Sequence, residues 1–238
     1  MSVFRFKKFD IDQSEAAMKV GTDGVLLGAW ASIDAEASKA LDIGTGTGLI
    51  ALQLAQRFKS LELMAIECDA AAARQAKFNA KQSVFAGRIE VVEADVLLWY
   101  KAFEKCFDAV VSNPPYFDEL PLGHHDARHV ARQSAYLPLD QLVQTAAFVL
   151  RDGGSFSLIV PAARADELHR FASKHGFQLK RYCLVKGRQD TPVRRILFDW
   201  VKTSAPLIVH REELVVEIER NCYTEEYRAL TAAFYLNF

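Results

Sequence analysis

The chain has 238 residues, of which half are hydrophobic and a quarter are charged, with a formal net charge of -1. This ordinary globular composition excludes a wholesale polycation, so any contact with nucleic acid must come from a local patch. No apolar run has the length of a membrane span or a signal peptide, and we expect a cytoplasmic protein with no membrane contact.

Short β-rich runs alternate with helical segments from residue 40 onward. Strands are predicted at residues 40–43, 61–67, 88–94, 107–112 and 155–160, and helices at 49–58, 70–83, 137–150 and 163–175. This alternation predicts an α/β fold with a doubly wound, mostly parallel sheet. Runs at 178–185 and 193–202 predict an antiparallel hairpin at its edge, and residues 224–236 predict a terminal helix capped by Thr224.

Asp42 and three glycines, Gly44, Gly46 and Gly48, lie between a predicted strand and a predicted helix. Glycines at this spacing allow a tight turn and let the backbone approach a ligand. A dinucleotide site would have the spacing Gly-x-Gly-x-x-Gly and a pyrophosphate at the helix N-terminus. Here an aspartate precedes a Gly-x-Gly-x-Gly loop, and a carboxylate repels phosphate but can position a cationic amino group. We therefore expect S-adenosyl-L-methionine; the alternative is a purely structural turn.

Two acidic residues end the next two predicted strands. Glu67 follows Gly48 by 19 residues, close to the spacing of about 20 at which an acid binds both ribose hydroxyls. A helix cap is the alternative, although Asp69 already suits that role. Asp95 can accept the adenine amine while Val96 offers its amide and an apolar face; the alternative is a solvated strand end.

Asn113-Pro114-Pro115-Tyr116 follows the predicted strand 107–112, so it emerges where ligands bind in open α/β sheets. An amino nitrogen conjugated to a ring is a poor nucleophile because its lone pair is delocalised. Hydrogen bonds from its N–H groups to the side-chain oxygen of Asn113 and the Pro114 carbonyl restore lone-pair density. Tyr116 can stack on the ring. The pattern indicates methyl transfer to a planar nitrogen; a proline-rich turn is the alternative.

The segment from Met18 to Trp30 resembles the one that precedes the glycine loop in bacterial amino-methyltransferases. Together with the glycine loop, Asn-Pro-Pro-Tyr and residues 223–238, it makes nearly the whole chain similar to the tRNA(Val) (adenine-N6)-methyltransferase family. That resemblance implies a seven-stranded, Rossmann-like class I methyltransferase fold and methylation of adenine 37, immediately 3′ of the anticodon. By analogy, Thr22 and Asp23 line the methionine end of the cofactor pocket.

The sequence contains no repeat, low-complexity tract or convincing linker, so we expect one domain over residues 1–238. Residues 1–38 would be an N-terminal motif segment with a possible substrate contact, and residues 39–238 the catalytic core. Family members carry a polar, arginine-containing insertion after Asn-Pro-Pro-Tyr, and residues 124–133 are similar in character, which makes Arg128 and Arg132 candidate substrate contacts.

Two basic patches are further candidates for binding tRNA through its anticodon stem-loop, whose loop bases are already unpaired. The first interleaves cations with phenylalanines, which suits base stacking and phosphate contact, and its cations are Arg5, Lys7 and Lys8. The second would surround the predicted hairpin turn, and its cations are Lys180, Arg181, Lys186, Arg188, Arg194 and Arg195. The alternative is a solvated hairpin face that does not contact RNA.

Three histidines cluster in the sequence, His124, His125 and His129, and they could bind a metal ion or lie in a polar loop. His125 and His129 are four residues apart and could share a helical face. The proposed chemistry needs no metal, and the four scattered cysteines favour reduced thiols over a zinc site. We therefore expect a polar loop, RNA-facing or simply solvated, and no metal.

The leading hypothesis from the sequence is an S-adenosylmethionine-dependent tRNA adenine-N6 methyltransferase, with a monomer as the default. A protein glutamine also fits Asn-Pro-Pro-Tyr, but only about 40 residues precede the glycine loop, too few for a helical recognition domain. DNA adenine is weakened by the lack of a separate DNA-reading domain. An RNA-binding scaffold with a degenerate methyltransferase fold is disfavoured because the loop, Glu67, Asp95 and Asn113 are intact.

Overall fold

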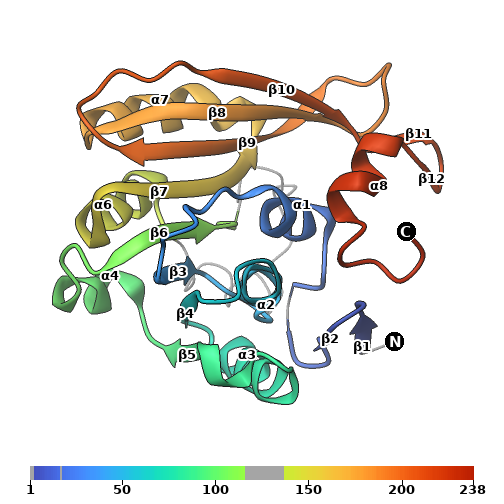
Figure 1. Ribbon diagram of the computed structural model, residues 1–238, viewed down its shortest axis with the longest axis horizontal. Helices are drawn as coiled ribbons and strands as arrows, with labels where there is room; N and C mark the ends of the chain where they lie inside the picture. The colour runs from blue at the N-terminus through green and yellow to red at the C-terminus, as the bar shows by residue number, and fades with distance from the viewer. Residues whose placement is uncertain (1–2, 17, 116–136) are drawn as a thin grey trace, which may run out of the picture.

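The computed structural model describes residues 3–16, 18–115 and 137–238 of the protein (Figure 1). Its main sheet has eight strands in the order β10-β8-β9-β7-β6-β3-β4-β5. Within the described residues, β9 alone runs antiparallel to its neighbours. The strands are β3 (Lys39–Ile43), β4 (Glu62–Glu67), β5 (Ile89–Glu93), β6 (Phe107–Ser112), β7 (Leu150–Pro161), β8 (Phe177–Lys186), β9 (Val193–Lys202) and β10 (His210–Val215).

Helices cover both faces of this sheet (Figure 1). One core cluster collects side chains from α1, α2, α3 and α8, and the other from α4, α6 and α7. Strand β6 shows how the clusters divide, because Ala109 and Val111 belong to the first and Val110 to the second. The helices are α1 (Thr22–Trp30), α2 (Leu49–Arg57), α3 (Ala70–Gln82), α4 (Val96–Trp99), α6 (Leu139–Val149), α7 (Ala165–Lys174) and α8 (Glu225–Thr231), with short 3-10 turns η1 (Ala86–Arg88), η2 (Tyr100–Ala102) and η3 (Ala162–Arg164).

The predicted fold class is confirmed, and β6 matches its predicted strand residue for residue. The sheet has one strand more than the seven expected, because β10 pairs in parallel with β8 from His210↔Arg181 to Val215↔Lys186. The hairpin of β8 and β9 therefore lies one strand inside the edge. The sequence of β10 begins with four charged or polar residues, so it lacks the apolar run by which the other strands were predicted. No helix among the described residues is long and apolar enough to cross a bilayer.

The N-terminal and C-terminal segments lie together in what we call the terminal clasp, residues 3–9 with 231–238. Strand β1 (Val3–Arg5) pairs with β2 (Asp10–Asp12), and Phe6 forms a β-bridge with Tyr235. The Lys7 ammonium donates hydrogen bonds to the backbone oxygens of Ala232 and Phe238 at 2.7 and 2.6 Å. Phe6 also packs on Phe4, Phe9 and Tyr235, with ring centroids 4.8 to 5.8 Å apart.

Helix α8 is shorter than the predicted terminal helix. Thr224 caps it as expected, accepting a hydrogen bond from the Tyr227 amide. The helix ends at Thr231, where the Phe234 amide closes a turn on the Thr231 carbonyl. The chain then turns into the clasp, so tertiary contacts override the apolar spacing that continues to residue 236. Two short strands, β11 (Glu217–Glu219) and β12 (Cys222–Tyr223), precede the helix.

Replacing Lys7 with methionine should lower stability, because it removes two charge-assisted hydrogen bonds that join the ends of the chain. We expect a loss on the order of 1 kcal/mol in the free energy of unfolding, measured by urea denaturation with an unchanged m-value. Lys8→Met, in the exposed neighbour, is the matched control and should keep the wild-type midpoint. Equal midpoints for the two variants would contradict a stabilising role for Lys7.

Candidate active site

The carboxyl ends of β3, β4 and β6 bring the predicted site residues to one edge of the sheet. Ile43 at the end of β3 pairs with Ile66 on one side and Ser112 on the other. The residues that follow these three positions are Gly44, Glu67 and Asn113. The parallel register thus places the glycine loop, the first acid and the Asn-Pro-Pro segment side by side, as the sequence predicted.

The glycine loop has the backbone geometry expected of a ligand cradle. Gly44 and Gly46 have φ of +71° and +58°, in the left-handed region that other residues rarely adopt. A Cβ added at either would meet nothing within 4 Å, so both lie beside open space. Gly48 is the N-cap of α2 and packs closely, since a Cβ there would lie 3.5 Å from that of Ala76 in α3.

Asp42 is fully buried beneath this loop. One of its oxygens, Oδ2, accepts a hydrogen bond from the Thr45 hydroxyl at 2.6 Å, while Oδ1 has no partner among the described residues. Burial raises the pKa of Asp42 to about 7, which the Thr45 hydroxyl and the Ala51 amide offset only in part. A buried carboxylate with an unpartnered oxygen suits a cationic amino group, so the donor set fits the methionine end of the expected cofactor.

Glu67 holds the loop in place from the neighbouring strand. Its Oε2 accepts from the Gly46 amide and its Oε1 from the Asp69 amide, both at 2.9 Å. These bonds use two of the roughly four acceptor positions of a carboxylate, so ribose contact stays a prediction. Asp69 caps α3 as expected, accepting from the Ala72 amide at 2.7 Å. Cys68, one of the four cysteines, is exposed here and lies 3.6 Å from Glu67 Oε1.

Asp95 and Val96 lie at the end of β5. The Asp95 side chain is exposed and caps α4, where its Oδ1 accepts from the Leu97 amide at 2.8 Å. Val96 is buried in the core. A helix-capping role for Asp95 was not anticipated, and its predicted contact with the adenine amine stays a prediction.

Asn113 follows β6 and is partly buried, while Pro114 is buried. The strand end is anchored by the Ser112 hydroxyl, which donates to the Ile43 carbonyl at 2.9 Å. Helix α1 begins beside it: a Cβ on Gly24 would lie 3.9 Å from Asn113 Nδ2 and 3.0 Å from a Leu49 methyl. The structure thus places Thr22 and Asp23, which begin α1, next to the Asn-Pro-Pro segment. Six residues named from the sequence lie outside the described residues, namely Tyr116, His124, His125, Arg128, His129 and Arg132.

Several cations of the predicted hairpin patch are engaged within the protein. Lys186 pairs with Glu213 at 2.7 Å, and Arg195 pairs through Nε with Asp23 at 2.8 Å. Arg181 lies in the interior between α1 and the sheet. Arg188 and Arg194 are exposed. Because β8 runs parallel to β7 and β9 returns from it, this turn lies at the same edge of the sheet as Asn113.

The N-terminal patch differs from the expectation. Phe6 and Phe9 are 4% and 5% exposed and belong to the aromatic packing of the clasp, so the prediction that they stack on RNA bases is wrong. Lys7 is held by the C-terminal segment. All three cations, Arg5, Lys7 and Lys8, are exposed, and Arg5 lies 4.0 Å from Asp10.

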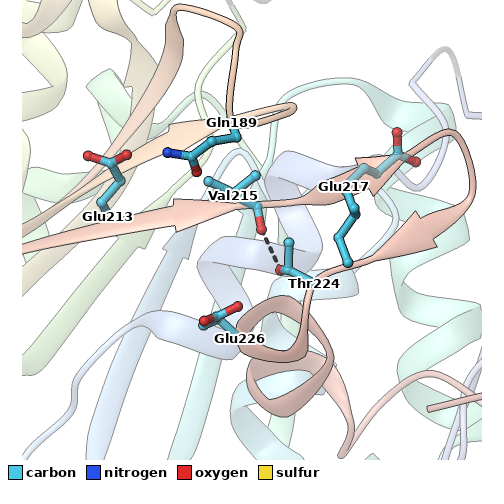
Figure 2. A pocket seen from close by; sticks show the side chains of 7 residues that line it. Gln189, Glu213, Val215, Glu217, Thr224 and Glu226 are labelled. Carbon is cyan, nitrogen blue, oxygen red and sulfur yellow. Dashed lines mark hydrogen bonds between the residues drawn. The ribbon is translucent and has the colours of Figure 1, made fainter.

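A cavity of about 400 Å³ lies between the hairpin turn, β10 and the start of α8 (Figure 2). Three glutamates, Glu213, Glu217 and Glu226, line it together with Gln189. A cavity with this charge repels phosphate, so it marks a boundary of any surface that binds nucleic acid. The described residues include no cluster of three or more His, Cys, Asp or Glu side chains that could hold a metal.

Comparisons with known proteins agree with this geometry. A family model described as the methyltransferase small domain matches residues 14–171. A Bacteroides thetaiotaomicron protein named tRNA1(Val) (adenine(37)-N6)-methyltransferase is 41% identical, covering 98% of this chain and 97% of its own length. A protein of the same name from Trichodesmium erythraeum is 39% identical, covering 99% and 98%. A crystal structure of a predicted O-methyltransferase from Agrobacterium tumefaciens shares the fold, with a TM-score of 0.68 at 22% identity, covering 89% of this chain and 96% of that one.

Replacing Asp42 with asparagine should change how stability depends on pH. Because burial raises the pKa of Asp42 from 3.8 to about 7, its contribution is fully present below pH 4 and is lost as the pH rises through 7. We expect the stability of the wild type relative to Asp42→Asn to fall by on the order of a few kcal/mol over that range, measured by urea unfolding at several pH values. A constant difference between the two proteins would contradict the raised pKa.

Proposed function

The chain belongs to the methyltransferase small domain family, among the tRNA1(Val) (adenine(37)-N6)-methyltransferases, and we propose that it methylates N6 of adenine 37 in that tRNA. The family is established by the match over residues 14–171 and by relatives about 40% identical over nearly the whole chain. Those relatives favour tRNA over a protein glutamine or DNA adenine. A tRNA substrate is consistent with the expected cytoplasmic location.

The single observation that carries the proposal is the position of Asn113 beside the cofactor cradle. Asn113 and Pro114 follow β6, and the adjacent strand β3 leads into the glycine loop. A methyl donor and a planar amine held at this edge would meet across neighbouring strand ends. Alignment of two reactants at such close quarters supplies much of the rate acceleration of a transfer reaction.

The residues that would hold S-adenosylmethionine come from three strand ends. Asp42 offers an unpartnered buried oxygen for the amino group, and Glu67 offers acceptor positions for the ribose hydroxyls. Val96 supplies an apolar contact and Asp95 a carboxylate for the adenine. When bound, the cofactor supplies a methyl group already activated by its sulfonium.

Asn113 and Pro114 act on the acceptor nitrogen. The side-chain oxygen of Asn113 and the backbone carbonyl of Pro114 each accept a hydrogen bond from the adenine amine, so its lone pair is less delocalised into the ring. The amine then becomes a better nucleophile without a strong base. Tyr116 stacks on the same ring and holds its plane; a contact of this kind contributes about 1–3 kcal/mol.

The hairpin turn binds the substrate backbone. Arg188 and Arg194 are exposed at the edge that carries Asn113, where they can meet phosphates beside the anticodon loop. The glutamate-lined cavity next to this turn limits the contact surface on the other side (Figure 2). Arg5, Lys8, Arg128 and Arg132 are further candidate contacts, and one protein molecule acting as a monomer is enough for the proposed site.

Asn113→Ala should abolish methyl transfer while sparing cofactor affinity, because it removes an acceptor for the substrate amine and no group assigned to the cofactor's ends. The assay follows label from methyl-labelled S-adenosylmethionine into tRNA, and calorimetry with S-adenosylhomocysteine reports the cofactor site. Removing one such positioned hydrogen-bonding group typically costs about 10²–10³ in rate. Full activity in Asn113→Ala would reject its role, and an inactive wild type would reject the proposed function.

Arg188→Ala and Arg194→Ala should each weaken tRNA binding and reduce its dependence on salt. Each arginine that contacts a phosphate releases counterions, so its loss lowers the slope of log K against log[salt] by about 1. Filter binding at salt concentrations from about 50 to 200 mM, a range over which phosphate contacts strongly change affinity, measures the tRNA dissociation constant and its salt slope. Cofactor affinity should be unchanged. An unaltered salt slope in both variants would remove the hairpin turn from the tRNA site.

A further inference from the structure

Two arginines of the β8–β9 hairpin hold helix α1, one at each of its ends. At its N-terminal end, Arg195 Nε of β9 pairs with Asp23 Oδ2 at 2.8 Å. At its C-terminal end, Arg181 of β8 donates to the Trp30 carbonyl at 2.5 Å, and its guanidinium lies 3.7 Å from the centroid of the Trp30 ring. The helix that borders Asn113 is thus fixed by the same hairpin that carries the exposed basic turn.

The Asp23–Arg195 pair is not an ordinary surface pair. The two side chains are 31% and 20% exposed, so they are largely shielded from solvent. Exposed ion pairs contribute little because water and salt screen them, whereas partial burial strengthens the attraction and makes loss of one partner more costly. Because the partners are 172 positions apart in the sequence, this contact exists only in the folded protein.

The pair also lies close to the reacting groups. Arg195 is in register with Pro161 at the end of β7, and β7 pairs with β6, which leads to Asn113. The residue after Asp23 is Gly24, which faces both Asn113 Nδ2 and Leu49 at the start of α2. Movement of the first turn of α1 would therefore be felt at the Asn113 amide and at the helix that follows the glycine loop.

We propose that the Asp23–Arg195 ion pair is a positioning element that holds the first turn of α1 against Asn113 and so sets the rate of methyl transfer. Arg195 then acts through Asp23 and the helix, rather than through a phosphate of the substrate. Asp23 likewise acts on the site by fixing Gly24 beside Asn113. This inference rests on the proposed function and assigns to the two residues a role different from cofactor contact and tRNA contact.

The test separates the rate of the chemical step from tRNA affinity. Arg195→Met and Asp23→Asn should each lower the single-turnover rate at saturating tRNA by roughly tenfold or more, since small misplacements of reacting groups can cost about 10²-fold. The tRNA dissociation constant and its salt slope should stay close to those of the wild type. Arg195→Lys, which keeps the charge, should recover part of the rate, as should the exchanged pair Asp23→Arg with Arg195→Asp.

A matched control comes from the opposite edge of the sheet. Arg151 pairs with Asp108 at 2.6 Å, near the amino end of β6 and away from Asn113. Arg151→Met removes an arginine from an ion pair of similar length and should leave the single-turnover rate unchanged. Thermal melting of every variant checks that the protein remains folded at the assay temperature.

Hydrogen exchange gives a readout that does not depend on activity. The amides of α1 should exchange faster in Arg195→Met than in the wild type, while those of α6 on the other face should not. Weakened tRNA binding with an unchanged single-turnover rate would overturn the inference in favour of a phosphate contact. Unchanged exchange in α1 would overturn it as well. A wild type that transfers no methyl group to tRNA, with faster exchange in the variant, would instead overturn the proposed function alone.

Discussion

The arrangement of the site depends on one partly buried arginine, Arg181. The Arg181 guanidinium contacts Asp199 of β9 at 3.2 Å and Glu212 of β10 at 3.3 Å, besides its contacts with Trp30. Burial raises the pKa of Asp199, and the charge of Arg181 offsets that rise only in part. Without the guanidinium both acids would lose their positively charged partner. Asp199 would be left as a fully buried carboxyl bonded, among the described residues, only to the Ser157 hydroxyl, which is the costly way to break such a network. The position of α1, and through it the surroundings of Asn113, follows from this cation.

Much of the fold and of the cofactor cradle could be predicted because both depend on local pattern. Buried parallel strands have near-continuous apolar runs, and the residues that end them meet at one edge whatever else the chain does. Asp42, the glycines, Glu67 and Asn113 therefore came together as expected. Helix α1 was not predicted as a helix, because seven of its nine residues are buried and leave no amphipathic period. The need for glycine at position 28 appears only in the folded structure, where a Cβ would lie 2.2 Å from the Gln53 side chain.

The contacts of the charged residues were harder to predict, because the tertiary structure determines which acid each cation pairs with. Arg181, Lys186 and Arg195 form a basic patch in the sequence. In the folded chain they pair with acids that are 18 to 172 positions away in the sequence, as the contacts of Arg181 with Asp199 and of Arg195 with Asp23 show. Local sequence places a positive charge but does not say whether it faces solvent. The aromatic residues of the N-terminal segment follow the same rule, since Phe6 is buried in packing that includes Tyr235, 229 positions away.

The terminal clasp must form late in the folding of the nascent chain, because its two segments are far apart in the sequence. Lys7 is translated well before its backbone partner at Ala232, which lies 225 positions later in the chain. Until those positions are translated, the phenylalanines around Lys7 have no aromatic partners from the far end and stay open to solvent or to chaperones. The clasp therefore closes only after every strand of the main sheet has been translated, since β10 ends at Val215.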